Sequence, residues 1–218
     1  MPQTAGELVI APHGLDEVLG CGGTIQRIRT AGQPVDLLVL FGDGTGRDEA
    51  RRAATGQVMD LLDIRSVRFG GFPENRSDTV PLAELIGTVE AAVSDLQPKA
   101  VYVSHGGSLN VDHQNCFKAA VTALRPVPGS SVRAIYTYEI QSSTDWAPHS
   151  TEPFLPTRYV DISDGLETKL EALQVYGEEM RPPPHARSLA SAEQLARRHG
   201  AVIGVAAAEA FCVIREIV

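Results

Sequence analysis

The sequence lacks the features that mark membrane, secreted and nucleic-acid-binding proteins. No apolar stretch approaches the roughly 18 residues of a bilayer-spanning helix. The N-terminal MPQTAGE has neither the basic nor the apolar region of a signal peptide. The formal net charge is -8, and no basic run is longer than two residues. We therefore expect a cytoplasmic protein with no nucleic-acid or membrane partner.

Cysteine is scarce as well. Cys21, Cys116 and Cys212 are odd in number and widely spaced, which fits reduced thiols better than a disulfide framework. Two of them, Cys21 and Cys116, lie close in sequence to the polar segments described below and could be metal ligands. Buried helix cysteines are common packing residues, however, and we favour that role.

The chain also lacks a complete G-x-G-x-x-G motif and a Walker lysine. It contains instead short apolar runs that alternate with longer amphipathic segments. Strands are expected at 8–11, 35–41, 100–104, 133–140, 158–162 and 210–218. Helices are expected at 20–31, 47–62, 81–96, 113–124, 163–180 and 188–199, and functional loops at 42–47, 70–80, 105–112 and 141–157. This alternation over 218 residues predicts one α/β domain, residues 1–218, with a mostly parallel sheet.

Three polar segments come where predicted strands end: PHGLDE (12–17), GDGTGRDE (42–49) and SHGGSLNVDH (104–113). Ligands of parallel α/β sheets gather beyond the carboxyl ends of the strands. The residues that this edge should bring into one cleft are His13, Asp16, His105, Asp112 and His113. Two imidazoles and a carboxylate are the ligand set of a catalytic zinc ion with one open position.

These residues also have simpler interpretations. Asp16 could cap the helix that follows it, and His13 could be a solvent-facing residue at a strand end. The glycines of GCGG (20–23) could cradle a phosphate, although close helix–strand packing is the interpretation that we favour. A nucleotide-binding Rossmann module without a metal therefore stays open beside the zinc site.

The segment APHGLDEVLGCGGTI (11–25) resembles the P-H-P-D-D-E-x-L-G-C-G-G-T-I opening of the LmbE-like (PIG-L) zinc-dependent N-deacetylases. Further segments are similar to that family: GFPENRSDTVPL, HGGSLNVDHQ, YEIQSSTDW and MRPPPHARS, so that the resemblance covers nearly the whole chain. It implies a Rossmann-like three-layer fold and a Zn²⁺ ion held by His13, Asp16 and His113. The implied reaction removes an N-acyl group, usually acetyl, from an amino sugar or a related small amide.

The departures from the family lie where the chemistry should be. Leu15 stands in place of the first of two aspartates, the proposed general base, and Gly14 in place of a proline. Ser108 stands where close relatives have an aspartate, and Ser104 where they often have a histidine. Loss of the base alone should lower the rate by about 10²–10⁴ if nothing replaces it. The alternative to an N-deacetylase is therefore a zinc-binding pseudoenzyme, a binding subunit in a glycan or natural-product pathway.

Three groups could take over proton transfer: Asp112, Glu17 and His185. We favour His185 as the catalytic proton shuttle, because it follows three prolines on a rigid segment and an imidazole titrates near neutral pH. Asp112 is the second catalytic candidate. It could equally be a carboxylate that orients a metal-binding histidine.

Contacts to the substrate, a small N-acyl amino-sugar-like molecule, are expected from Arg47, Asn75, Arg76, Asn110 and Arg187. Arg47 could equally form an ion pair with Glu49 at a helix start. His149 and His199 stand in no motif and are assigned to the surface. The sequence leaves open whether the chain forms a homo-oligomer.

Overall fold

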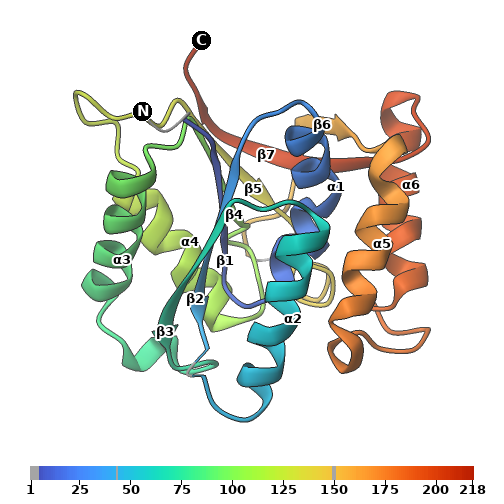
Figure 1. Ribbon diagram of the computed structural model, residues 1–218, viewed down its shortest axis with the longest axis horizontal. Coiled ribbons are helices and arrows are strands. Elements are labelled where there is room, and N and C mark those ends of the chain that lie inside the picture. Colours follow the sequence, from blue (N-terminus) through green and yellow to red (C-terminus); the bar gives the residue numbers. More distant parts are fainter. Residues whose placement is uncertain (1–4, 43, 149–150) are drawn as a thin grey trace.

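A seven-stranded sheet forms the middle of three layers in the computed structural model, which describes residues 5–42, 44–148 and 151–218 (Figure 1). The strands are β1 (Glu7–Ala11), β2 (Val35–Phe41), β3 (Ser66–Phe72), β4 (Ala100–Ser104), β5 (Ala134–Tyr138), β6 (Arg158–Asp161) and β7 (Ala208–Glu216). Their order across the sheet is β3-β2-β1-β4-β5-β7-β6. β7 is antiparallel to β5 and β6, and the other neighbouring strands are parallel.

Helices cover both faces of the sheet. The helices on one face are α1 (Asp16–Thr30), α2 (Arg47–Leu61), α5 (Leu166–Val175) and α6 (Leu189–Ile203), and those on the other are α3 (Leu82–Leu96) and α4 (Val111–Ala123) (Figure 1). Short 3₁₀ helices are η1 (Ser77–Thr79), η2 (Ser163–Gly165) and η3 (Gly177–Glu179). Within the described ranges, no helix has the length and apolar character to cross a bilayer.

The strand β1 shows how the sequence builds two cores. Successive side chains of a strand point to opposite faces of the sheet. Leu8 and Ile10 accordingly pack with the apolar side chains of α3 and α4, whereas Val9 and Ala11 pack with those of α1 and α2. All four are buried. The continuous apolar run of β1 is thus explained by helices on both sides, as is typical of parallel sheets.

The glycines near the start of α1 allow this helix to approach its neighbours closely. A Cβ atom on Gly20 would lie 2.1 Å from the ring of Tyr138, and one on Gly23 would lie 2.7 Å from Ile162. Only hydrogen fits at these distances. The packing interpretation of GCGG is therefore confirmed.

The predicted elements agree with the observed ones apart from a few boundaries and one missed strand. α1 begins at Asp16, four residues earlier than predicted, and the predicted helix 163–180 is η2, α5 and η3 in succession. The missed strand is β3. It is a half-buried edge strand that contains two glycines, Gly70 and Gly71, and its apolar pattern is weak.

The cysteines and the two histidines outside any motif, His149 and His199, are expected to have no role in the site. Cys21 and Cys116 are fully buried in the two cores, as expected of packing residues, and all three cysteines are free. The assignment of His199 to the surface is wrong: this residue is partly buried, and its Nε2 lies 2.6 Å from a carboxylate oxygen of Glu139. His149 lies outside the described residues.

Candidate metal centre

The candidate site lies at the point where the strand order reverses. β1 is followed by β2 and β3 on one side, whereas β4 and β5 lie on its other side. The crevice beyond the carboxyl ends of two such strands is where open α/β sheets bind ligands. His13 lies just beyond β1, and His113 lies in the first turn of α4, beyond β4. Sheet topology therefore brings together two segments that are far apart in the sequence.

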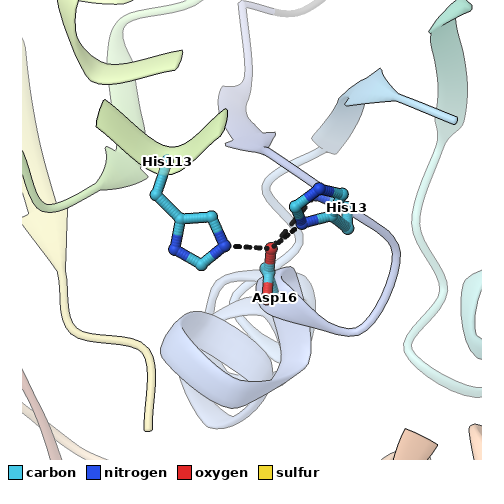
Figure 2. Close-up of side chains that lie close together, drawn as sticks. All are labelled: His13, Asp16 and His113. Atoms are coloured by element: carbon cyan, nitrogen blue, oxygen red, sulfur yellow. Dashed lines mark hydrogen bonds and ion pairs between the residues drawn. The ribbon is translucent and has the colours of Figure 1, made fainter. Parts of the chain in front are cut away.

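Three side chains converge in this crevice, with the Asp16 carboxylate between the rings of His13 and His113 (Figure 2). Oδ2 of Asp16 lies 3.2 Å from Nδ1 of His13 and 3.4 Å from Nε2 of His113. A tetrahedral zinc ion with ligand distances of about 2.0–2.1 Å would separate its ligand atoms by about 3.3 Å. The two measured separations fit this value, so the donor set suits a zinc-sized ion.

A second set of hydrogen bonds fixes the two rings. Nε2 of His13 lies 2.8 Å from Oδ2 of Asp112, and Nδ1 of His113 lies 3.1 Å from Oγ of Ser108. Asp112 in turn accepts hydrogen bonds from the backbone N–H groups of Asn75 and Ser77. Such outer partners select the ring tautomer and orient the nitrogen that faces the metal. Asp112 and Ser108 are placed to do so for His13 and His113.

Burial and the neighbouring charges set the protonation of these groups. Burial lowers the pKa of His113 to about 4, so this ring is neutral at pH 7. Burial also lowers the pKa of His13, but hydrogen bonds to Asp112 and Asp16 raise it by more, to about 9. Burial raises the pKa of Asp16, whereas His113 and His13 lower it by more, so that Asp16 is ionised. The protein without metal thus holds a charged His13 between two carboxylates.

The turn between β1 and α1 holds Asp16 in place through a strained residue. Leu15 has φ +97°, a backbone conformation that leucine rarely adopts. Its carbonyl accepts the N–H groups of Val18 and Leu19, which begin the helix. Asp16 does not cap α1, because its Oδ2 accepts the backbone N–H of His13 instead. The capping interpretation of Asp16 is therefore wrong.

A cavity of about 400 Å³ opens from the metal centre. The described residues that line it are His13, Gly14, Leu15, Asp16, Arg47, Arg51, Glu74, Asn75, Leu109, Asn110, His113, Ile140, Ser142, Ser143, Trp146, Glu179 and Arg187. One wall consists of ion pairs. Arg47 binds Glu179 through two hydrogen bonds of 2.6 Å, and Arg51 binds Glu74 through bonds of 3.1 and 3.2 Å.

The cavity contains four of the five predicted substrate contacts: Arg47, Asn75, Asn110 and Arg187. The fifth, Arg76, is exposed and stands outside the lining given above. Arg47 pairs with Glu179, and the expected pair with Glu49 is not among the ion pairs of the described residues.

The candidates for proton transfer all lie outside the lining of the cavity. Asp112 is fully buried, and both of its oxygens accept hydrogen bonds. Glu17 is buried behind the site and accepts a hydrogen bond from the hydroxyl of Tyr176. His185 lies against Trp146 with ring centres 5.3 Å apart, and its Nδ1 accepts the N–H of Arg187. His185 contacts the cavity lining through Trp146, and Asp112 contacts it through His13 and Asn75.

The expectation that His105 joins this cleft is wrong. Its ring contacts Thr137 Oγ1 and the carbonyl oxygen of Glu152, each at 3.2 Å, and packs edge-on against Phe154. His105 therefore anchors the segment between β5 and β6. It comes directly after a strand, which is the same signal that correctly located His13.

The sequence does not single out several of the lining residues, above all Arg51, Glu74, Glu179 and Trp146. Glu74 and Trp146 belong to two of the expected functional loops, at 70–80 and 141–157. Arg51 lies inside a helix and Glu179 in a 3₁₀ turn, where nothing in the local sequence sets them apart.

Comparisons with known proteins find relatives and similar structures over most of the chain. The chain is 23% identical over 196 residues to a probable N-acetyl-alpha-D-glucosaminyl L-malate deacetylase 2 of Bacillus cereus, covering 83% of this chain and 87% of that one. The structure matches the conserved protein TT1542 of Thermus thermophilus with a TM-score of 0.79 and 25% identity over 98% of this chain and 96% of the other. It matches the N,N'-diacetylchitobiose deacetylase of Pyrococcus horikoshii with a TM-score of 0.78 and 20% identity, covering 98% and 85% of the two chains.

Residues 8–124, more than half of the chain, match the family PIG-L, GlcNAc-PI de-N-acetylase. The chain therefore belongs to the PIG-L (LmbE-like) family.

Proposed function

We propose that the protein is a zinc-dependent N-deacetylase that removes the acetyl group from a small amino sugar or related amide in the cytoplasm. The observation that carries this proposal is the convergence of His13, Asp16 and His113 at separations that suit a tetrahedral ion. The family supports the reaction type. The amino-sugar class is supported by the Bacillus cereus relative, which is named for an N-acetylglucosaminyl substrate.

The proposed metal ion and the protein side chains would have different roles in the reaction. When bound, zinc would supply the Lewis acidity that activates water and polarises the amide carbonyl. His13, Asp16 and His113 would hold it. Asn75 and Asn110 line the cavity and are joined by a hydrogen bond of 3.2 Å between their side chains. Their amides can exchange hydrogen bonds with sugar hydroxyls, and Arg47 also lines the cavity.

For proton transfer we propose His185, with Asp112 as a positioning residue. Both oxygens of Asp112 are engaged by His13 and two backbone N–H groups, so this carboxylate orients His13 rather than moving protons. The ring of His185 lies beside Trp146 at the cavity mouth, and its Nδ1 is occupied by the Arg187 N–H. That arrangement directs the exchangeable proton of His185 to Nε2.

Leu15 favours a second candidate function, that of a zinc-binding pseudoenzyme. It presents an apolar side chain at the position of the family's proposed base and lines the cavity. Apart from Asp16, the described carboxylates that line the cavity are Glu74 and Glu179, and both are paired with arginines. Burial raises the pKa of Glu179 but its arginine partners lower it by more, which makes Glu179 a weak proton acceptor. A protein with this site could bind an N-acyl sugar without turnover.

Metal analysis combined with an assay of amine release from N-acetyl sugars tests both candidates. We expect about one zinc ion per chain and turnover of at least one substrate. His113→Ala should remove the metal, with the circular dichroism spectrum unchanged. Stoichiometric zinc without turnover would favour the pseudoenzyme. If wild-type protein reconstituted with zinc holds no stoichiometric metal, both candidates are wrong and the nucleotide-binding alternative returns.

The role of His185 is tested with two substitutions. His185→Ala should lower kcat about 10²-fold or more with unchanged zinc content. His185→Gln keeps a polar side chain of similar size but does not titrate, so it should be equally impaired. Full activity of His185→Gln would assign the ring a packing role against Trp146.

A further inference from the structure

Three arginines line the cavity, and two of them are already neutralised. Arg47 is paired with Glu179 and Arg51 with Glu74. The side chain of Arg187 has no ion pair or hydrogen bond to the described part of the chain. Its Nε is buried without a partner, as is the Nε of Arg51, so the lack of any partner for the whole guanidinium is what distinguishes Arg187. A buried donor without a partner is costly. The side-chain N–H groups of Arg187 are therefore available to donate hydrogen bonds to a ligand.

The backbone of Arg187 is held firmly although its side chain is unpaired. Its N–H donates to Nδ1 of His185 at 3.0 Å, and its carbonyl accepts the N–H of Arg181 at 3.0 Å. The next residue, Ser188, caps α6 by accepting the N–H of Ser191. Three fixed points therefore hold the backbone of Arg187 beside the cavity, so that binding of an anion has to order only its side chain.

Arg187 lines the same cavity as the ion-paired wall and the candidate metal ligands. Burial raises the pKa of Glu179, but Arg47, Arg51 and Arg187 lower it by more. Arg187 therefore acts electrostatically on the ion-paired wall. An anion bound to Arg187 would lie in the same cavity as the candidate metal ligands.

We propose that Arg187 binds an anionic group of the substrate, a carboxylate or a phosphate, so that the preferred substrate is a negatively charged N-acetyl amino sugar. The inference rests on the proposed function, because it concerns the substrate of that site. A planar guanidinium forms paired hydrogen bonds with either kind of anion. Trp146 and Leu109 are more than half exposed at the mouth and offer apolar surface to the uncharged part of the molecule.

Matched substrates test the proposal by activity. The panel is N-acetylglucosamine, its 1-phosphate, its 6-phosphate and N-acetylmuramic acid, which carries a carboxylate. We expect kcat/KM for at least one anionic member to exceed that for the neutral sugar by about tenfold or more. Arg187→Met should abolish this preference by lowering kcat/KM for the anionic members to about the value for the neutral sugar. Arg181→Met, at an arginine of the same segment that is outside the lining of this cavity, is the matched control and should keep the preference.

Tryptophan fluorescence gives a second readout that needs no turnover. Trp146 is the only tryptophan of the sequence and lies at the cavity mouth. Anionic sugars should change its emission, and Arg187→Met should weaken their binding about tenfold or more at unchanged zinc content. If this occurs without hydrolysis of any sugar, the anion site stands and the deacetylase proposal fails.

Other outcomes would overturn the anion site alone. Equal kcat/KM values for neutral and anionic sugars would show that the protein is a deacetylase that has no anion subsite. A preference for anions that survives in Arg187→Met would mean that the metal, rather than Arg187, binds the anion. Absence of both binding and turnover for the anionic sugars would reject the inference as well.

Discussion

The carboxylate of Asp112 lies 2.8 Å from Nε2 of His13, on the ring edge opposite the nitrogen that faces Asp16. Its own oxygens are held by the backbone N–H groups of Asn75 and Ser77. The loop after β3 therefore fixes Asp112, and Asp112 fixes His13. A residue adjacent to one histidine in sequence thus supports the other histidine in space.

Asp112→Asn should weaken zinc binding without unfolding the protein. The amide keeps the shape of the side chain but removes the charge that favours the required tautomer of His13, and loss of such a partner lowers metal affinity about 10–100-fold. Competition with a chromophoric chelator measures the change. Asp95→Asn, at an exposed ion pair with Arg68, is the control and should bind zinc like the wild type. Equal affinities in the two variants would show that Asp112 does not orient His13.

Zinc binding should depend on pH through His13. In the metal-free protein, burial lowers its pKa but the hydrogen bonds to Asp112 and Asp16 raise it to about 9. Nδ1 must lose its proton before it can bind a metal, so zinc competes with this proton below about pH 9. Apparent affinity should rise about tenfold per pH unit between roughly pH 6 and 8, with release of about one proton per zinc ion. Calorimetry in buffers of different ionisation enthalpy measures the release. An affinity that is flat over this range would contradict the assignment.

The raised pKa of His13 has a matching consequence for the metal-free fold. The interaction of charged His13 with its two carboxylates stabilises the protein fully below the ordinary histidine pKa of 6.5. This contribution is lost as the pH rises through about 9. The melting temperature of chelator-treated wild type should therefore fall across that range. Asp112→Asn, which weakens the interaction, should show a smaller fall.

Much of the fold and the place of the candidate metal site could be predicted because local sequence signals and sheet topology coincide. Apolar runs such as 8–11 and 35–41 end in polar segments, and parallel strands place those ends at one edge. This reasoning located His13 and Asp16 and, through β4, His113. It failed for His105 because position after a strand does not determine which way a side chain points. Ser104, one residue earlier, hydrogen-bonds toward the carbonyl of His113.

The cavity wall could not be predicted because it depends on tertiary pairing. Arg51 and Glu74 come from α2 and from the loop after β3, and Glu179 comes from η3 near the C-terminal part of the fold. Charged residues are common on helix surfaces, so nothing in the sequence shows that these would face one another. The edge strand β3 escaped prediction for a related reason: a half-buried strand has a weaker apolar pattern than a central one.

Gly20→Ala should destabilise the protein by about 1–3 kcal/mol through overpacking. The added Cβ would lie 2.1 Å from the ring of Tyr138, and this ring is tethered because its hydroxyl donates to the carbonyl of Ile10 at 2.8 Å. Gly56→Ala, in the exposed interior of α2 with nothing within 4 Å of the new Cβ, is the control. It should stabilise by about 0.5–1 kcal/mol. Urea denaturation measures both, and a stabilised Gly20→Ala would refute the close packing of α1 on β5.

Leu15 occupies an unfavourable backbone conformation for its type. Its φ of +97° and ψ of -39° lie outside the left-handed helical region in which aspartate and asparagine are enriched, so these residues are not favoured here either. The leucine side chain compensates by packing in the core shared with Val18 and Leu19, and it forms part of the cavity lining. Replacement by a short polar residue therefore keeps the backbone strain and removes apolar contacts. The melting temperature should fall modestly.

Leu15→Asp should raise the rate of amide hydrolysis by up to about 10²–10⁴, because it returns a proton-accepting carboxylate to the position of the family's proposed base. The gain should appear in kcat at unchanged zinc content. Leu15→Asn has the same shape and the same backbone preference but accepts no proton, so it should show no gain. Equal gains in both variants would mean that pocket shape, rather than a base, limits the reaction. If zinc is bound and neither variant gains, the proton acceptor lies elsewhere, and His185→Gln then shows whether it is His185.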